Sequence, residues 1–91
     1  RVTSQPPRYA VVTGRVREAS RQERYVYLNF GADWRRDFTA RVPTERVAAI
    51  KRGGLDPERL AGHVITVRGW LFEANGPMIE VSAAGQIEVT E

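Results

Sequence analysis

The sequence contains no cysteine and only one histidine, His63. Without cysteine the chain can form no disulfide, zinc-thiolate site, iron–sulfur cluster or thiol nucleophile. His63 follows Gly62 at the start of a predicted strand, where we expect a surface residue rather than a metal ligand or a base. We therefore expect no catalytic residue, no cofactor and no enzyme activity in this chain.

Long hydrophobic runs are also missing. No apolar stretch approaches the roughly 20 residues that a membrane-spanning helix needs, and we expect no membrane insertion. The 91 residues can bury one small core but cannot form two lobes around a cleft. We expect a flexible lead-in over residues 1–8, which contain Pro6 and Pro7, and a single domain over residues 9–91. Because the first residue is not Met, we expect a processed form or an excised piece.

Acidic residues are scattered rather than clustered. Asp33 and Asp37 form the best local pair, and they flank a predicted turn. Carboxylates in that position can bind Mg²⁺ or Ca²⁺, but more often they accept hydrogen bonds from turn backbone groups. Gly53 and Gly54 lack the spacing and the Lys-Ser/Thr of a phosphate-binding loop. We therefore expect no metal site and no nucleotide-phosphate loop.

Positive charge is concentrated in the first part of the chain. Residues 1–52 carry twelve basic and five acidic residues, a net charge of +7, whereas residues 53–91 carry two and six, a net charge of −4. Thirteen of the fourteen basic residues are Arg, which pairs with phosphate through its planar fork and stacks on bases. The basic half indicates an anionic partner; the alternative is an ordinary solvated surface.

A repeat of two residues predicts most of the strands. Apolar residues alternate with polar ones in five segments, three in the first half of the domain and two in the second half. A short extension follows at the end of the domain. The expected inward residues are Val12, Val16, Val26, Leu28, Phe30, Phe38, Ala40, Val42, Ile65, Val67, Leu71, Ile79 and Val81, and Ile87 and Val89 mark the terminal extension. Residues 74–77, with an Asn-Gly pair, predict a hairpin turn.

A helical connection is predicted between the third and fourth of these strands. Val47 and Ile50 have helical spacing before Gly53 and Gly54, and Asp56 followed by Pro57 predicts a further helical turn. Three strands, a helix and a two-stranded hairpin form the order of an OB-fold, so we expect an all-β, five-stranded Greek-key barrel with one short helix. An SH3-like barrel is the main alternative, but it has no helix of this length at that point.

The same alternation predicts a binding face. If Val26 and Leu28 point inward, then the residues between and beside them point outward. OB-folds bind oligonucleotides on the outer face of their second and third strands. The predicted nucleic-acid-binding residues are Tyr25, Tyr27, Asn29, Thr39, Arg41 and the turn residue Trp34, with Arg15, Arg17, Arg21 and Arg24 along the phosphate backbone.

Structural roles remain open for the aromatic residues. Tyr25 and Tyr27 can form a cross-strand packing pair beneath the N-terminal segment or a neighbouring domain. Trp34 can close the end of the barrel instead of stacking on a base. For Trp70 and Phe72 we expect packing beneath the helix or against another domain.

Several short runs resemble the OB-fold module that follows the catalytic domain of bacterial thermonuclease-family (staphylococcal-nuclease-like) proteins, and related modules of exported nucleases. The resemblance covers residues 9–89 and depends most on Tyr27–Gly31 with Asp37–Thr39. The runs are Val12–Val16, Tyr27–Gly31, Trp34, Asp37–Thr39, Leu60–Gly62 and Val67–Gly69. The resemblance implies a nucleic-acid-binding accessory module of an exported or periplasmic protein, with any nuclease activity in a separate catalytic domain.

Two functions therefore remain open at this point. One is a module that binds single-stranded DNA or RNA with little sequence preference, attached to or acting with a nuclease. The other is a protein-interaction module that docks its tyrosine face onto a partner domain.

Overall fold

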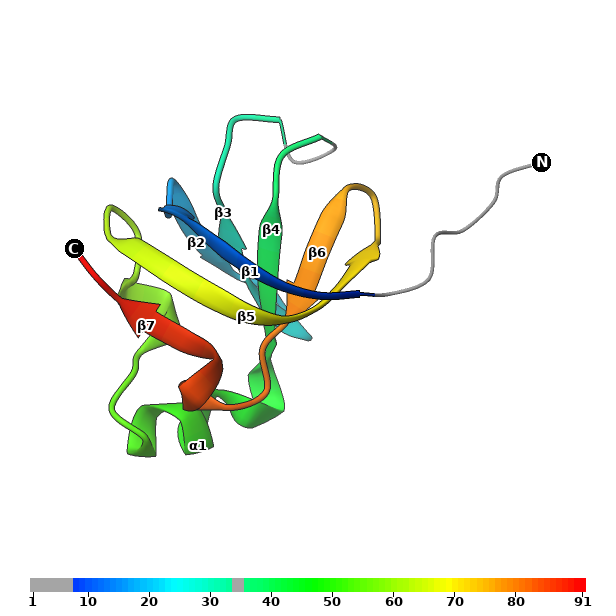
Figure 1. The fold of residues 1–91 in the computed structure, drawn as a ribbon. Helices are drawn as coiled ribbons and strands as arrows, with labels where there is room; N and C mark the ends of the chain where they lie inside the picture. The colour runs from blue at the N-terminus through cyan, green and yellow to red at the C-terminus, as the bar shows by residue number, and fades with distance from the viewer. Residues whose placement is uncertain (1–7, 34–35) are drawn as a thin grey trace.

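The computed structural model describes residues 8–33 and 36–91. This part of the chain consists mostly of β-strands, with one α-helix and three short 3₁₀ helices (Figure 1). The strands are β1 (Arg8–Arg15), β2 (Glu18–Arg21), β3 (Tyr25–Asn29), β4 (Thr39–Pro43), β5 (Val64–Glu73), β6 (Pro77–Glu80) and β7 (Ile87–Val89). The helices are η1 (Thr44–Arg46), α1 (Val47–Arg52), η2 (Pro57–Arg59) and η3 (Ala84–Gln86).

The strands form one sheet whose hydrogen-bonded order is β1-β5-β6-β4-β3-β2, with β7 also paired to β5. Every ladder is antiparallel except that between β4 and β6. No ladder between described residues joins β2 back to β1, so the sheet has seven strands and is not closed. The expected all-β class with a short helix is confirmed, whereas the closed five-stranded barrel is not.

The strand count exceeds five for two reasons: β2 follows the first expected strand as a separate strand, and the terminal extension forms β7. β1 pairs with β5, and β2 pairs with β3. Between them the backbone N–H of Val16 donates to the carbonyl of His63 at 2.8 Å, and that of Arg17 donates to the carbonyl of Asn29 at 2.7 Å. A period of two does not reveal which strand lies alongside, so this division could not be read from the pattern.

The core lies on one face of the sheet and contains the residues that alternation placed there. Most of the expected inward residues are buried, and Val12, Phe30, Phe38 and Leu71 pack against them partly buried. Leu60 and Ile87 complete the core. Full burial of one aliphatic side chain stabilises the fold by about 1.5–3 kcal/mol, so this cluster holds the outer face of the sheet in place.

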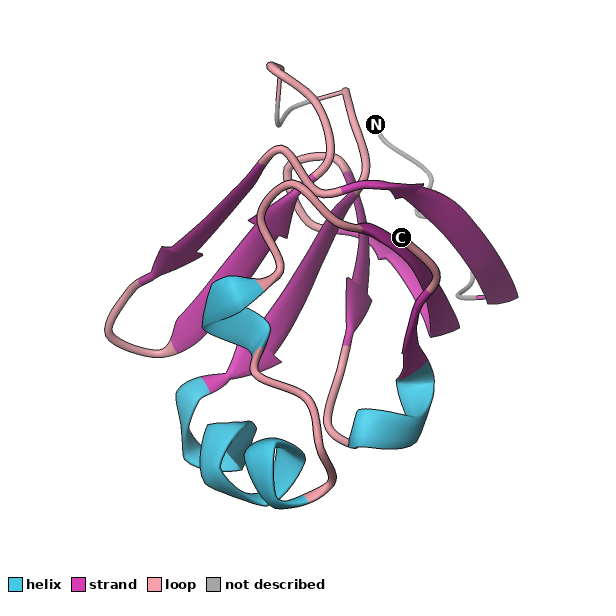
Figure 2. Cartoon of the chain, turned by 90° about the vertical axis from the view of Figure 1, so that its left-hand side faces the viewer, coloured by secondary structure: helices cyan, strands magenta, loops and turns pink. Residues whose placement is uncertain are grey.

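The helical connection is confirmed and closes one end of the core. Val47 and Ile50 are the buried residues of α1, which Figure 2 shows beyond the end of the strands. In the next turn the Asp56 carboxylate accepts a hydrogen bond from the backbone N–H of Glu58 at 3.1 Å, with Pro57 at the first helical position. Among the described residues no helix has the length and apolarity to cross a membrane.

Candidate functional site

The outer face of β3 and β4 carries the residues that the sequence placed there. Along β3, Val26 and Leu28 are buried, while Tyr25, Tyr27 and Asn29 are half-buried on the opposite side. Tyr27 lies opposite Arg41 and Asn29 lies opposite Thr39 in the β3–β4 ladder. Cross-strand partners share a face, so these four predicted residues form one patch.

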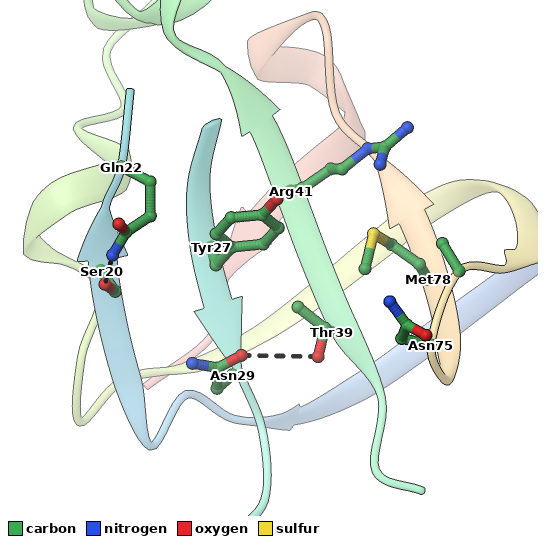
Figure 3. A pocket seen from close by; sticks show the side chains of 9 residues that line it. Ser20, Gln22, Tyr27, Asn29, Thr39, Arg41, Asn75 and Met78 are labelled. Atoms are coloured by element: carbon green, nitrogen blue, oxygen red, sulfur yellow. Dashed lines mark hydrogen bonds between the residues drawn. The ribbon is translucent and has the colours of Figure 1, made fainter. Parts of the chain in front are cut away.

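This patch forms the floor of a groove of about 400 Å³. Tyr27, Asn29, Thr39 and Arg41 all line the groove, as Figure 3 shows. On one side the groove is bordered by Ser20 of β2 and by Gln22, and on the other by the β5–β6 turn and β6, the further lining residues being Ala74, Asn75 and Met78.

The β5–β6 turn is shaped by its Asn-Gly pair. Asn75 has a φ of 56° and Gly76 a φ of 117°, and Asn and Gly are the residues that adopt positive φ most readily. The predicted hairpin turn is therefore confirmed. Its conformation places Asn75 at the edge of the groove.

Polar groups line the groove floor and rim. The Thr39 hydroxyl donates to Oδ1 of Asn29 at 3.4 Å, and the Gln22 amide nitrogen donates to the Ser20 hydroxyl at 2.7 Å. Within the described part of the chain, no hydrogen bond joins the Asn75 side chain to another residue, and no buried side-chain nitrogen or oxygen lacks a partner. The groove therefore offers an aromatic surface together with solvent-facing amide groups.

Arg41 is held by three side chains at once. Its guanidinium carbon lies 4.4 Å from the ring centroid of Tyr25 and 5.1 Å from that of Phe72. Its Nε donates to Oε1 of Glu80 at 2.9 Å, and the Arg41 side chain is only 22% exposed. Tyr25 thus contacts Arg41 and lies 5.7 Å from the ring of Tyr27, but it is not among the groove-lining residues.

The other predicted arginines do not line the groove. Arg15 on β1 donates to the carbonyl of Gly62 at 2.6 Å and pairs with Glu91 at 3.3 Å. Arg21 pairs with Glu58 of η2 at 2.7 Å.

Arg17 and Arg24 are exposed, one beyond each end of β2. No ion pair joins either of them to another residue within the described ranges. Arg17 and Arg24 therefore differ from Arg15, Arg21 and Arg41, which each pair with a glutamate. Fewer of the predicted arginines are free to meet an anion than the charge count suggested.

The turn between β3 and β4 contains the remaining predicted residues. Trp34 lies outside the described residues. The Asp37 carboxylate accepts a hydrogen bond from the backbone N–H of Asp33 at 3.0 Å, which is the turn-stabilising role. No group of three or more His, Cys, Asp or Glu residues within 8–33 and 36–91 could hold a metal ion. His63 is exposed, with Nδ1 at 3.1 Å from the carbonyl oxygen of Glu91.

Trp70 and Phe72 do not pack beneath the helix, contrary to that part of the expectation. Both lie on the outer face of β5, where Phe72 contacts Arg41 and Trp70 is 62% exposed against Tyr9. The alternation along this strand could have placed both rings on the outer face, because Ile65 and Val67 occupy its inward positions. The groove-bordering residues Ser20, Gln22 and Met78 were also missed, since their approach depends on strand pairing rather than on local pattern.

Comparison with models of protein families, with curated proteins and with solved structures finds no match to this chain. The resemblance to nuclease-associated modules therefore stays a prediction.

Proposed function

We propose that the groove over β3 and β4 binds single-stranded nucleic acid with little sequence preference, and that the sheet is an OB-fold. In this interpretation β1 and β2 are two halves of one bent first strand. The hydrogen-bonded order then runs 1-2-3-5-4-1 with five principal strands, β7 being an addition to β5. A partly open barrel is an ordinary form of this fold.

The observation that carries the proposal is the position of the groove. OB-folds bind oligonucleotides over their second and third strands, between the loop joining strands one and two and the loop joining strands four and five. The groove of about 400 Å³ has β3 and β4 as its floor, Gln22 from the first of these loops and Asn75 from the second. A general pocket of the surface would not need to coincide with all three features.

The chemistry of the groove suits bases and phosphates together. Stacking of one base on an aromatic ring contributes about 1–3 kcal/mol and tolerates any sequence; Tyr27 offers such a ring. Arg17 and Arg24, beyond opposite ends of β2, are free to contact phosphates. Arg41 can contact a phosphate if its ion pair with Glu80 breaks. The amides of Asn29 and Asn75 can hydrogen-bond a base edge.

We propose further that the chain acts as an accessory to a nuclease catalytic domain in an exported protein, as the resemblance implies. Binding by the module would hold a strand near a separate active site. This part rests on the sequence resemblance alone.

A protein-interaction module is the second candidate, and one observation favours it. Arg15, Arg21 and Arg41 are each paired with a glutamate, which lowers the positive potential that a nucleic acid would meet. A partner domain could then cover the Tyr25 and Tyr27 face, where Glu80 already neutralises Arg41.

The test uses Tyr27, with a variant that keeps the ring as its control. Binding of a fluorescein-labelled oligothymidylate is measured by anisotropy at low salt for the parent chain, Tyr27→Phe and Tyr27→Ala. We expect Tyr27→Phe to bind nearly as tightly as the parent and Tyr27→Ala to bind several-fold more weakly. Equal binding by all three would contradict the assignment of the groove.

A further inference from the structure

Two aromatic side chains outside the groove are largely exposed. Tyr9 of β1 is 58% exposed and Trp70 of β5 is 62% exposed. They are direct partners in the β1–β5 ladder, and their ring centroids lie 5.6 Å apart at 85°. The edge-to-face contact orders both rings, yet more than half of each residue's surface faces solvent.

A hollow of about 380 Å³ adjoins this pair and also touches Phe72 and Glu80. Phe72 and Glu80 both contact Arg41, which lines the groove. Phe72 lies 5.1 Å from the Arg41 guanidinium carbon, and Glu80 pairs with the Arg41 Nε at 2.9 Å. In the ladders, Arg41 lies opposite Glu80 and Phe72 lies opposite Met78. The groove and this second hollow therefore lie side by side on one continuous outer face of the sheet.

The separation of the two hollows matches a few nucleotides. From β3 to β5 the path crosses β4 and β6, and neighbouring strands lie about 4.8 Å apart, so Tyr27 and Trp70 are separated by roughly 14 Å across the sheet. Stacked nucleotides rise about 3.4 Å each. About four nucleotides would bridge the two rings, and fewer if the strand is extended.

We propose that the single strand bound in the groove continues across Arg41 and Phe72 to a second base-stacking site formed by Trp70 and Tyr9. This inference rests on the proposed function and specifies how long a strand the module binds. The strand contributes one base to Tyr27 and a later one to the exposed ring of Trp70.

The second site favours a base over a phosphate. Arg68, which lines the hollow, is already paired with Glu88 at 3.3 Å, and Arg41 is paired with Glu80. The Gln86 side chain is also occupied, because its Oε1 accepts from the backbone N–H groups of Ser82 and Ala83 and its Nε2 donates to the carbonyls of Arg68 and Glu80. The exposed rings are therefore the main groups left to bind a ligand, and stacking needs no free charge.

The experiment follows Trp70 fluorescence during titration with oligothymidylates of different length. All proteins carry Trp34→Phe, which keeps a ring at position 34 and leaves Trp70 as the sole tryptophan. The ligands are oligomers of three and nine nucleotides. Binding of the unlabelled oligomers is followed by Trp70 emission, and binding of the fluorescein-labelled oligomers is followed by anisotropy. The variants added to this background are Trp70→Phe, Trp70→Ala and Tyr27→Ala, each checked for folding by circular dichroism.

We expect the nine-nucleotide strand to quench Trp70 and to bind about tenfold more tightly than the three-nucleotide strand. Trp70→Ala should remove most of that length-dependent gain, and Trp70→Phe should keep part of it. Binding of the short strand should depend on Tyr27 and not on Trp70.

The alternatives give different results. Suppose that Tyr27→Ala weakens binding, that the strands leave Trp70 emission unchanged, and that the nine-nucleotide strand binds no more tightly than the three-nucleotide strand. The second site is then wrong, and the proposed function of the groove is retained. If neither oligomer binds, the proposed function fails and the inference fails with it. If the protein instead forms a dimer that Trp70→Ala disrupts in sedimentation, the rings are a protein interface and the inference is overturned.

Discussion

Arg41 and Glu80 form an ion pair at the boundary of the groove, with Nε of the arginine 2.9 Å from Oε1 of the glutamate. The two residues are opposite each other in the parallel β4–β6 ladder, so the sheet itself holds them together. The pair places a carboxylate beside the cation that the groove would use for phosphate. Under the proposed function, Glu80 would compete with the bound strand for Arg41.

Removal of this competition should strengthen binding. Glu80→Gln keeps the side-chain shape but releases the Arg41 guanidinium to phosphate, and we expect tighter binding of oligothymidylate. One more single-strand phosphate contact makes the slope of log affinity against log salt steeper by about 0.7. Glu45→Gln removes an exposed charge from η1 and serves as the control that should leave the slope unchanged. Weaker binding by Glu80→Gln would mean that Glu80 holds Arg41 in the orientation that binding needs, and does not compete with phosphate for it.

Adjacent residues of β3 should separate stability from binding. Leu28 is fully buried, and Leu28→Ala should reduce the free energy of unfolding by about 2–5 kcal/mol in urea denaturation. Tyr27→Ala, on the opposite face, should cost far less stability while weakening strand binding. Equal destabilisation by the two variants would place Tyr27 in the core and remove it from the binding face.

The unpaired arginines should determine the salt dependence. Arg17→Glu and Arg24→Glu each remove a cation at one end of β2, and each should flatten the slope of log affinity against log salt by about 0.7. Arg59→Glu, on η2, is the matched control and should not change it. If Arg59→Glu flattens the slope as much as the other two, net charge rather than this face governs binding.

The chain alone should not cleave nucleic acid. It has no cysteine and one histidine, and the Asp37 carboxylate is engaged by the backbone of its own turn. We expect no turnover of a labelled DNA or RNA oligonucleotide with Mg²⁺ or Ca²⁺. Cleavage that disappears with Asp33→Asn or Asp37→Asn would show a catalytic site in that turn and would overturn the interpretation as a binding module.

Alternation along each strand was enough to predict the faces of the sheet. The side-chain directions along β3 follow from local geometry, because successive side chains of a strand point to opposite sides. Val26 and Leu28 point inward, and Tyr27 and Asn29 point outward. The helix between the third and fourth predicted strands followed in the same way from the spacing of Val47 and Ile50.

Contacts between distant segments could not be predicted from the sequence. The pairing of Arg41 with Glu80 joins residues 39 positions apart, and that of Arg21 with Glu58 joins residues 37 apart. No local pattern reports such pairs, so the charge count overstated how many of the predicted arginines are free of a glutamate. The division of the first strand at Val16 and Arg17 likewise depends on which strands lie beside it.

The salt dependence of binding tests the central claim most directly. Anisotropy of a labelled nine-nucleotide oligothymidylate is measured against protein concentration at several salt concentrations. With Arg17 and Arg24 each contacting one phosphate and Arg41 held by Glu80, log affinity should fall against log salt with a slope of about −1.4, since each single-strand contact contributes roughly 0.7. Absence of binding at low salt, or a slope near zero, would contradict nucleic-acid binding and favour a protein partner for this face.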